Sequence, residues 1–273
     1  MAEPSTLPHG GRGLQVFHEQ RTRLPPHPES SHTEHRLTFV VEGTIQLECG
    51  GRVRVGGGSL VAIPAGIPHR SLGGRSVEYW LATFCATCLR IDEGQVLMQP
   101  FRRVRHGALP VVAVPAKRRR RIVQHFRELR QELELDAPES PELSRSLLLL
   151  LLGETTRAMP ADASPAAVGS FVGDALGFIQ RRALSPISLS DVAAAVHRSP
   201  AHVAATVKKD TGYTVGSWIR AARVSEAASR LIHTDESLDE IATRVGWGDK
   251  THFIRQFAKV YGLTPAKWRK ANQ

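Results

Sequence analysis

The sequence predicts two domains, an all-β domain followed by two helices and then an all-α domain. A length of 273 residues is more than one hydrophobic core usually serves. Short β-branched runs cut by glycine and proline fill residues 14–114, whereas residues 171–273 carry only helical periodicity. A repeat of about 50 residues divides this second part into two related halves. The C-terminal domain is therefore expected to hold two helix-turn-helix motifs joined by a linker helix.

The composition indicates a soluble, basic protein. The 36 Lys and Arg residues exceed the 26 Asp and Glu residues, which gives a formal net charge of +10. This excess favours nucleic acid as a partner, although a basic protein that is merely soluble has the same composition. The longest apolar run, Leu147–Leu152, is far shorter than the roughly 20 residues of a membrane span. With no signal-peptide pattern and only three cysteines, we expect a cytoplasmic protein without membrane contact.

The first domain is expected at residues 13–158, after a flexible tail at residues 1–12. Turn residues separate its apolar runs, and Gly50-Gly51 between two of them is typical of a tight hairpin. Several short strands at this spacing predict a barrel or a sandwich. The runs are LTFVVEG, TIQLECGG, RVRVGGG and SLVAIPAG, which together cover residues 37–66.

Two helices are predicted to complete this domain. The second begins near Pro141 with Glu142 in its first turn, where a carboxylate is favourable for the helix dipole. Its leucine run makes it apolar nearly all round, and such a helix is usually buried on several sides. Residues 116–158 are therefore predicted to form a homodimer interface, with packing inside their own domain as the alternative. The first helix has its apolar face at Ile122, Val123, Phe126, Leu129 and Leu133.

A run of five basic residues, Lys117–Arg121, opens the first of these helices. Positive charge lies at the wrong end of a helix for its dipole, so the sequence offers no structural reason for this run. A solvated helix start is favoured over a contact with DNA.

Residues 159–170 are predicted to be a linker, because they are rich in Pro, Ala and Ser and lack periodicity. The second domain then spans residues 171–273. Its first helix-turn-helix is expected at about residues 188–212 and its second at about residues 237–262. The linker helix between them is expected at residues 215–232.

The two halves of the repeat align residue by residue. Leu189–Val196 matches Leu238–Val245 at an offset of 49, and later matches have an offset of 50. One extra residue has therefore entered between the two halves of the second copy, in the stretch from Arg244 to Phe257. The later matches pair Val207 with Phe257, Gly212 with Gly262, Thr214 with Thr264 and Trp218 with Trp268.

Each copy carries the residues that a helix-turn-helix turn requires. Gly246 can adopt a positive φ at no steric cost, and His197 holds the same place in the first copy, where histidine is moderately tolerated. The second helix of each copy begins at a residue that can cap free backbone donors, Ser199 before Pro200 in one copy and Asp249 in the other.

The second helix of the second copy is predicted to enter the major groove. Phe253 and Phe257 lie one turn apart and are expected to face inward. Arginine can bond guanine O6 and N7 together, and threonine can contact a thymine methyl group. A solvated helix face is the alternative, but two copies in a basic segment favour DNA. The expected DNA-binding residues of this copy are Lys250, Thr251, His252 and Arg255.

The linker helix sets the expected spacing of the two motifs. Residues 215–232 would span about 27 Å at about 1.5 Å per residue. That length could hold two reading helices near one DNA turn apart, about 34 Å, in successive major grooves.

The stretch from Arg223 to Arg269 resembles the AraC/XylS family of bacterial transcription regulators. The resemblance covers roughly the last hundred residues and implies a seven-helix domain that binds double-stranded promoter DNA. It also implies a transcription regulator, with activator as the expected role and RNA polymerase as a further expected partner. The family's phenylalanine after the turn glycine is Trp247 here. The matching marks are Ile241-Ala242, Val245 to Trp247, the spacing of Phe253 and Phe257, and Gly262 with Thr264-Pro265 before Trp268.

The first copy departs from this family pattern. Ala201, Ala204 and Ala205 stand where the family usually places polar or aromatic side chains that read bases. Alanine can only touch methyl groups or let the backbone come close, so the second copy is expected to discriminate more strongly. His202 carries most of the expected base contact, and two lysines are expected to contact phosphate. The expected DNA-binding residues of this copy are Ser199, Ala201, His202, Ala205, Lys208 and Lys209.

The N-terminal domain resembles the cupin barrel that commonly precedes such a DNA-binding domain. The marks are Val41 to Gly43 and IPAGIPH, which ends at His69. Metal-binding cupins place three histidines and a glutamate around one ion. In this sequence those four positions hold Ser30, His32, Arg36 and His69.

Two of four metal ligands are thus missing, so no metal ion and no cofactor is expected, and His32 and His69 are the remaining candidate ligands. His32, Arg36, Thr38 and His69 are instead expected to bind an anionic or hydroxylated small molecule.

The protein is expected to be a regulator and not an enzyme. The alternatives are a constitutive DNA-binding regulator whose barrel only dimerises, and a metal-dependent cupin enzyme with a DNA-binding tail.

Cys85 and Cys88 form a lone CxxC motif. Without a second pair it is a weak zinc signal. A redox CxxC usually starts a helix, whereas WLATFCATCL has the pattern of a strand. Thiol sensing and simple burial of small side chains both remain open.

Overall fold

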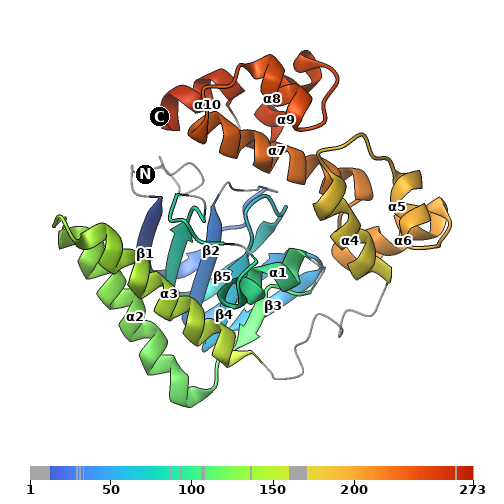
Figure 1. The fold of residues 1–273 in the computed structure, drawn as a ribbon. Coiled ribbons are helices and arrows are strands. Elements are labelled where there is room, and N and C mark those ends of the chain that lie inside the picture. The colour runs from blue at the N-terminus through green and yellow to red at the C-terminus, as the bar shows by residue number, and fades with distance from the viewer. Residues whose placement is uncertain are drawn as a thin grey trace.

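A computed structural model describes residues 13–28, 30, 32, 34–86, 88–92, 94–105, 108–135, 137–159, 171–261 and 263–272. The predicted tail at residues 1–12 and residues 160–170 of the predicted linker lie outside the described residues. Figure 1 shows a sheet-rich N-terminal part, here called the sheet domain, and a C-terminal part built of helices, here called the helical domain. The predicted two-domain architecture is confirmed. None of the described helices is both long enough and apolar enough to cross a bilayer.

The sheet domain contains one six-stranded sheet with the order β1-β5-β2-β4-β6, and β3 pairs with β2 beside that path. Among the described residues no pairing returns from β6 to β1, so the predicted closed barrel is not formed by these hydrogen bonds. The strands also differ in length, since β5 has 15 residues and β6 only three. The strands are β1 (Leu14–Leu24), β2 (His35–Glu48), β3 (Arg52–Gly56), β4 (Ser59–Ile63), β5 (Arg70–Phe84) and β6 (Val111–Ala113).

Two hydrophobic clusters cover opposite faces of the sheet, as the period of two along a strand requires. Leu37 and Phe39 of β2 point into a cluster with α2 (Ala116–Leu135) and α3 (Ser140–Ala158). Val40, Ile45 and Leu47 face the other side, which we call the inner face. Figure 1 shows α2 and α3 crossing the outer face together.

The basic run at the start of α2 has a structural role that its sequence did not reveal. Arg118 and Arg121 lie 2.7 and 3.5 Å from the carboxylate of Glu154 on α3, whose side chain is only 2% exposed. Arg119 donates to the carbonyl oxygen of Val114. Burial raises the pKa of Glu154, but the arginines outweigh burial and hold that pKa below its usual value. Four of the five basic side chains are exposed, as a solvated helix start requires, but the run also has a structural reason that the sequence did not offer.

The helical domain contains two hydrophobic cores of different extent. The core around α4 (Phe171–Arg182), α5 (Leu189–Ala195) and α6 (Pro200–Thr211) is continuous with the inner-face cluster of the sheet domain. The core around α8 (Leu238–Arg244), α9 (Lys250–Tyr261) and α10 (Pro265–Asn272) forms a separate cluster. The helix α7 (Val215–His233) contributes to both.

The backbone of the sheet domain touches α7 closely at Gly66. This glycine has φ +75°, and a Cβ built on it would lie 2.5 Å from the Cβ of Ser225. Only a residue without a side chain fits at this approach. Figure 1 shows α7 running between the strand ends and helices α8 to α10. The central helix of the helical domain is thus in contact with the sheet domain.

Candidate nucleic-acid interface

The first helix of each repeat begins with the same reciprocal cap. The Ser188 hydroxyl accepts from the backbone N–H of Asp191, whose carboxylate accepts from the backbone N–H of Ser188. Ser237 and Glu240 make the same exchange at the start of α8. Such a capping box satisfies two free donors at once and fixes where the helix begins.

The turn of each motif has the backbone conformation predicted from its sequence. Gly246 has φ +84° and His197 has φ +53°, so both residues lie in the left-handed region. A Cβ built at Gly246 would lie 2.6 Å from the carbonyl oxygen of Leu184. The second turn therefore requires glycine for two reasons, its φ and its close approach to the chain before the first repeat.

The second helix of each repeat is capped by the residue that the sequence indicated. The Ser199 hydroxyl accepts from the backbone N–H of His202 at 3.3 Å. The Asp249 carboxylate accepts from the backbone N–H groups of Thr251 and His252, both at 2.9 Å. These two hydrogen bonds, that of Thr251 first, lower the pKa of Asp249. A charged cap thus begins α9, whereas a neutral cap begins α6.

Helix α9 presents a polar surface over a buried aromatic one. Phe253 and Phe257 are fully buried, as predicted. The Lys250 ammonium is not isolated, because it lies 2.6 Å from the carboxylate of Asp239 on α8. The four residues predicted to bind DNA are all exposed on the same helix: Lys250, Thr251, His252 and Arg255.

Helix α6 has the same arrangement with smaller side chains. Val203 and Val207 are fully buried on its inner side. The imidazole of His202 packs against Phe171 at 5.0 Å between ring centroids, and the Arg198 guanidinium lies over the same ring. The six residues predicted to bind DNA are all exposed: Ser199, Ala201, His202, Ala205, Lys208 and Lys209.

An arginine that sequence reasoning passed over fixes α7 to the chain that leads into the first repeat. Arg223 Nε donates to the carbonyl oxygen of Ala183 at 2.6 Å, and its terminal nitrogen donates to that of Ser185 at 2.9 Å. Gly246 of the second repeat contacts Leu184, which lies between those two acceptors. Both repeats are therefore joined at one point as well as through α7. The arginine is marked only by its place in the connecting helix, so a local motif could not identify it.

The residues predicted to bind a small molecule gather on the inner face of the sheet and at its rim. Arg36 and Thr38 lie on one face of β2, since they are two residues apart. His69 is 8% exposed, and its ring lies 4.9 Å from the ring of His32. His35, the first residue of β2, packs instead on the outer face between two phenylalanines.

The charged members of this group are the Arg36 guanidinium and, beside it, the Glu34 carboxylate, which raises the pKa of Arg36 against the effect of burial. Burial, followed by Arg36, lowers the pKa of His32 well below its usual value. Burial also lowers the pKa of His69 to about 4, although its hydrogen bond to the Ile67 carbonyl opposes this shift. Arg36 has a pKa of about 10 for the same reason and stays protonated near pH 7. A guanidinium beside two rings suits an anion better than a metal ion.

Two family models match separate parts of the chain. A helix-turn-helix domain matches residues 192–271, and a cupin domain matches residues 20–74. The first range begins within α5, after its Ser188–Asp191 cap, and runs into α10, whereas the second covers the end of β1, all of β2 to β4 and the start of β5.

Known regulators are similar to part of the chain. MarA, the multiple antibiotic resistance protein of Escherichia coli K12, is 30% identical over 97 residues, which are 36% of this chain and 76% of MarA. AdaA of Bacillus subtilis, a bifunctional transcriptional activator and DNA repair enzyme, is 33% identical over 96 residues. That match spans 35% of this chain and only 46% of AdaA, less than half of the relative's length. Among solved structures, ToxT from Vibrio cholerae covers 96% of this chain and 99% of its own, at 10% identity and a TM-score of 0.48.

Proposed function

Because the chain belongs to the AraC/XylS family of transcription regulators, we propose that it binds double-stranded promoter DNA through α6 and α9 and regulates transcription there. The observation that carries this proposal is the pair of exposed second helices, each held by its own cap and turn. A small molecule bound by the sheet domain is proposed to modulate this binding.

The arrangement of the two repeats supports simultaneous contact with two segments of major groove. Helix α7 has 19 residues, which at about 1.5 Å per residue is about 28 Å. That length is close to one turn of DNA, about 34 Å. The contacts of Arg223 and Gly246 restrict rotation of one repeat against the other.

The second repeat is proposed to supply most of the sequence discrimination. Arg255 is long, charged and exposed, and a bidentate bond to guanine is worth about 1–3 kcal/mol of discrimination. Thr251 and His252 lie within one turn of it on the same exposed face. Lys250 is the weakest candidate of this group, since its ion pair with Asp239 must open before it can bond a base.

The first repeat is proposed to position the protein more than to read bases. Lys208 and Lys209 lie in the last turn of α6 and suit phosphate contact. Ala201 and Ala205 allow the helix backbone to approach the groove closely. His202 is the imidazole of this helix available for a base edge, and its contact with Phe171 restricts its rotamers.

The effector is proposed to be an anionic or hydroxylated small molecule held by Arg36, Thr38, His32 and His69. The cation at the usual glutamate position supports this choice over a metal-dependent cupin enzyme. The continuous core between the inner face and the first repeat gives such a molecule a physical route to the DNA-binding helices. A constitutive regulator remains the alternative, and a ligand that changes DNA affinity would exclude it.

A homodimer through residues 116–158 is supported by exposed leucines on α3. Leu143 and Leu150 are 46% and 51% exposed and lie seven residues apart, on one face of the helix. An apolar row of this kind suits a second copy of the same helix. Contact with RNA polymerase, activation as opposed to repression, and a cytoplasmic location stay predictions.

The test compares two arginines of the full-length protein, Arg255 on α9 and Arg54, which is exposed on β3. Binding to a duplex selected from a random pool and to its scrambled form is measured by fluorescence anisotropy at fixed salt. Arg255→Ala is expected to weaken binding to the selected duplex by about 10- to 100-fold, with little change for the scrambled one. Arg54→Ala should leave both affinities unchanged. If Arg255→Ala binds the selected duplex as tightly and selectively as the parent, the proposal is wrong.

A further inference from the structure

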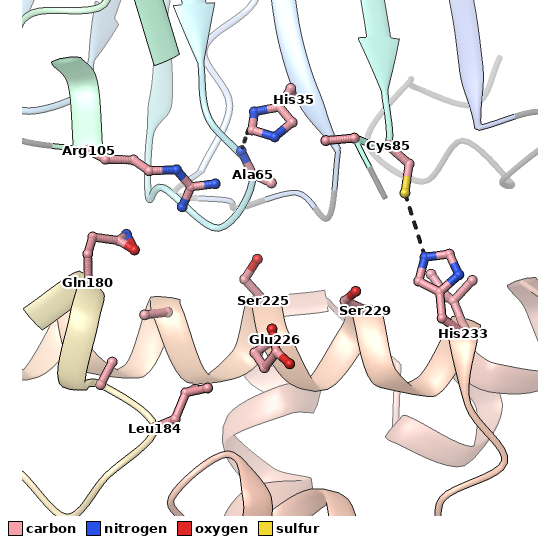
Figure 2. Close-up of a pocket in the computed structure, with 14 residues that line it drawn as sticks. His35, Ala65, Cys85, Arg105, Gln180, Leu184, Ser225, Glu226, Ser229 and His233 are labelled. Atoms are coloured by element: carbon pink, nitrogen blue, oxygen red, sulfur yellow. Dashed lines mark hydrogen bonds between the residues drawn. The ribbon is translucent and has the colours of Figure 1, made fainter. Parts of the chain in front are cut away.

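Two thiols of the sheet domain meet an imidazole of the helical domain. Cys85 and Cys88 follow the end of β5 at Phe84, so the expected strand stops just before the motif. His233 is the last residue of α7. Figure 2 shows the Cys85 side chain and the His233 ring pointing toward each other across the boundary between the domains.

The distances in this group are those of ligands around a small ion. Each sulfur atom, that of Cys85 and that of Cys88, lies 3.6 Å from Nε2 of His233. All three ligand atoms lie within 4.8 Å of one another. A tetrahedral Zn²⁺ ion with Zn–S bonds of about 2.3 Å and Zn–N bonds of about 2.0–2.1 Å separates S from N by about 3.6 Å. The S···N separations therefore match an edge of that tetrahedron.

Hydrogen bonds alone explain the arrangement of the two thiols and the imidazole less well than a bound metal ion does. Nε2 carries either one proton or one lone pair, so it serves one thiol in a normal hydrogen bond and not two. The backbone N–H of Cys88 also donates to the Cys85 sulfur at 3.3 Å. A backbone donor of this kind orients a thiolate ligand and offsets part of its charge.

The surroundings of the group permit an ion to enter. Cys88 and His233 are exposed and Cys85 is half-buried. In the part of the chain that the structure describes, no other set of three His, Cys, Asp or Glu side chains brings its ligand atoms together in this way. The site adjoins a cavity of about 260 Å³ between the sheet and α7, into which Arg105, Gln180 and Glu226 also point (Figure 2).

We propose that Cys85, Cys88 and His233 bind one Zn²⁺ ion, with water in the fourth position. Two thiolates and an imidazole are ligands that zinc prefers, and three protein ligands leave one position open. Because two ligands come from the sheet domain and one from α7, the ion binds only the arrangement in which the domains are in contact. It stabilises that arrangement relative to others and so ties the sheet domain to the helix that carries both repeats.

The test uses the reduced full-length protein without a polyhistidine tag, after treatment with a chelator. Titration with Co²⁺ is expected to give one ion per chain, with a thiolate-to-cobalt charge-transfer band and the intense visible bands of tetrahedral Co²⁺. Addition of Zn²⁺ should remove these bands. Cys85→Ser, Cys88→Ser and His233→Ala should each weaken metal binding by at least about 100-fold.

Cys49 supplies the matched control, because it is the third cysteine and lies buried in the core, away from the site. Cys49→Ala should keep the full spectrum. Unfolding curves of each variant, and the milder His233→Gln, separate loss of a ligand from loss of fold. The proposal is overturned if no bands appear, or if they survive loss of His233. It is also overturned if the two cysteines fail to bind metal and instead form a disulfide under mild oxidation.

Discussion

The two helix-turn-helix repeats have the same backbone arrangement. They differ in the hydrophobic core that each packs on and in the side chains that each exposes. Both begin with a capping box and turn through a residue of positive φ. The core of the first repeat is continuous with the inner face of the sheet, whereas the second repeat has its own core. Both second helices present a histidine and lysine to solvent, but the first adds alanines, whereas the second adds threonine and arginine.

This difference suggests that the two repeats have different roles within the helical domain. A repeat that shares its core with the sheet domain responds to changes there, because a packed core transmits small displacements. A repeat with a separate core can keep its reading helix in one geometry. We infer that the first repeat carries the signal and the phosphate contacts, while the second reads the sequence.

The largest expected effect lies in the two turns. Gly246→Ala places a methyl group 2.6 Å from the Leu184 carbonyl at a φ of +84°, and should destabilise the protein by about 1–3 kcal/mol. The matched change His197→Gly introduces no side chain and should alter stability by less than about 0.5 kcal/mol. Urea unfolding of the full-length protein checks both. Equal changes in the free energy of unfolding for the two variants would contradict the proposed difference between the two turns.

The second prediction compares the contributions of His252 on α9 and His202 on α6 to DNA affinity. His252→Ala should reduce affinity for a selected duplex by about tenfold, because its ring is exposed on the face of α9 that carries Arg255. His202→Ala should reduce affinity by less than about threefold, since Phe171 already restricts that ring. Anisotropy titrations at one salt concentration measure both. A larger reduction for His202→Ala would reverse the assignment of the two repeats.

A smaller and less specific effect is expected at the end of α6. Replacing Lys208 and Lys209 together by alanine should weaken binding to the selected and scrambled duplexes by the same factor. The slope of log affinity against log salt should become shallower by about 2, roughly one unit for each phosphate that is no longer neutralised. The measurement is a salt series with each duplex. A change confined to the selected duplex would mean that these lysines read bases.

The smallest effect concerns the two caps and appears only in acid. The pKa of Asp249 is lowered in the folded state, so its contribution to stability is present above the unfolded pKa of about 3.8 and is lost as the pH falls below it. Asp249→Ser gives α9 the neutral cap of α6. The parent should therefore unfold at a higher temperature than this variant at pH 6, and the gap should narrow toward pH 3. A gap that does not depend on pH would contradict the charged cap.

Local features of both repeats could be predicted because neighbouring residues determine them. The positive φ of Gly246 and His197 and the caps at Ser199 and Asp249 follow from a few residues each. The linker helix predicted at residues 215–232 is present as α7, one residue longer. The positions of the exposed side chains on α9 follow from helical periodicity once the buried phenylalanines are known.

Features that depend on distant partners could not be predicted in the same way. The reason for the basic run is Glu154, more than 30 residues away on another helix. Strand lengths and pairing, which decide whether a barrel closes, are also long-range properties. The third ligand of the CxxC motif, His233, is separated from Cys88 by 145 residues and lies in the other domain.

The measurement that tests the central claim most directly is selection of bound duplexes from a random pool by the full-length protein. The account predicts two enriched half-sites whose centres lie about 10 base pairs apart. One half-site should show strong base preferences and the other only weak ones. Arg255→Ala should weaken the base preferences of the first half-site alone. A pool without enrichment, or two half-sites with equally strong base preferences that Arg255→Ala leaves unchanged, would contradict it.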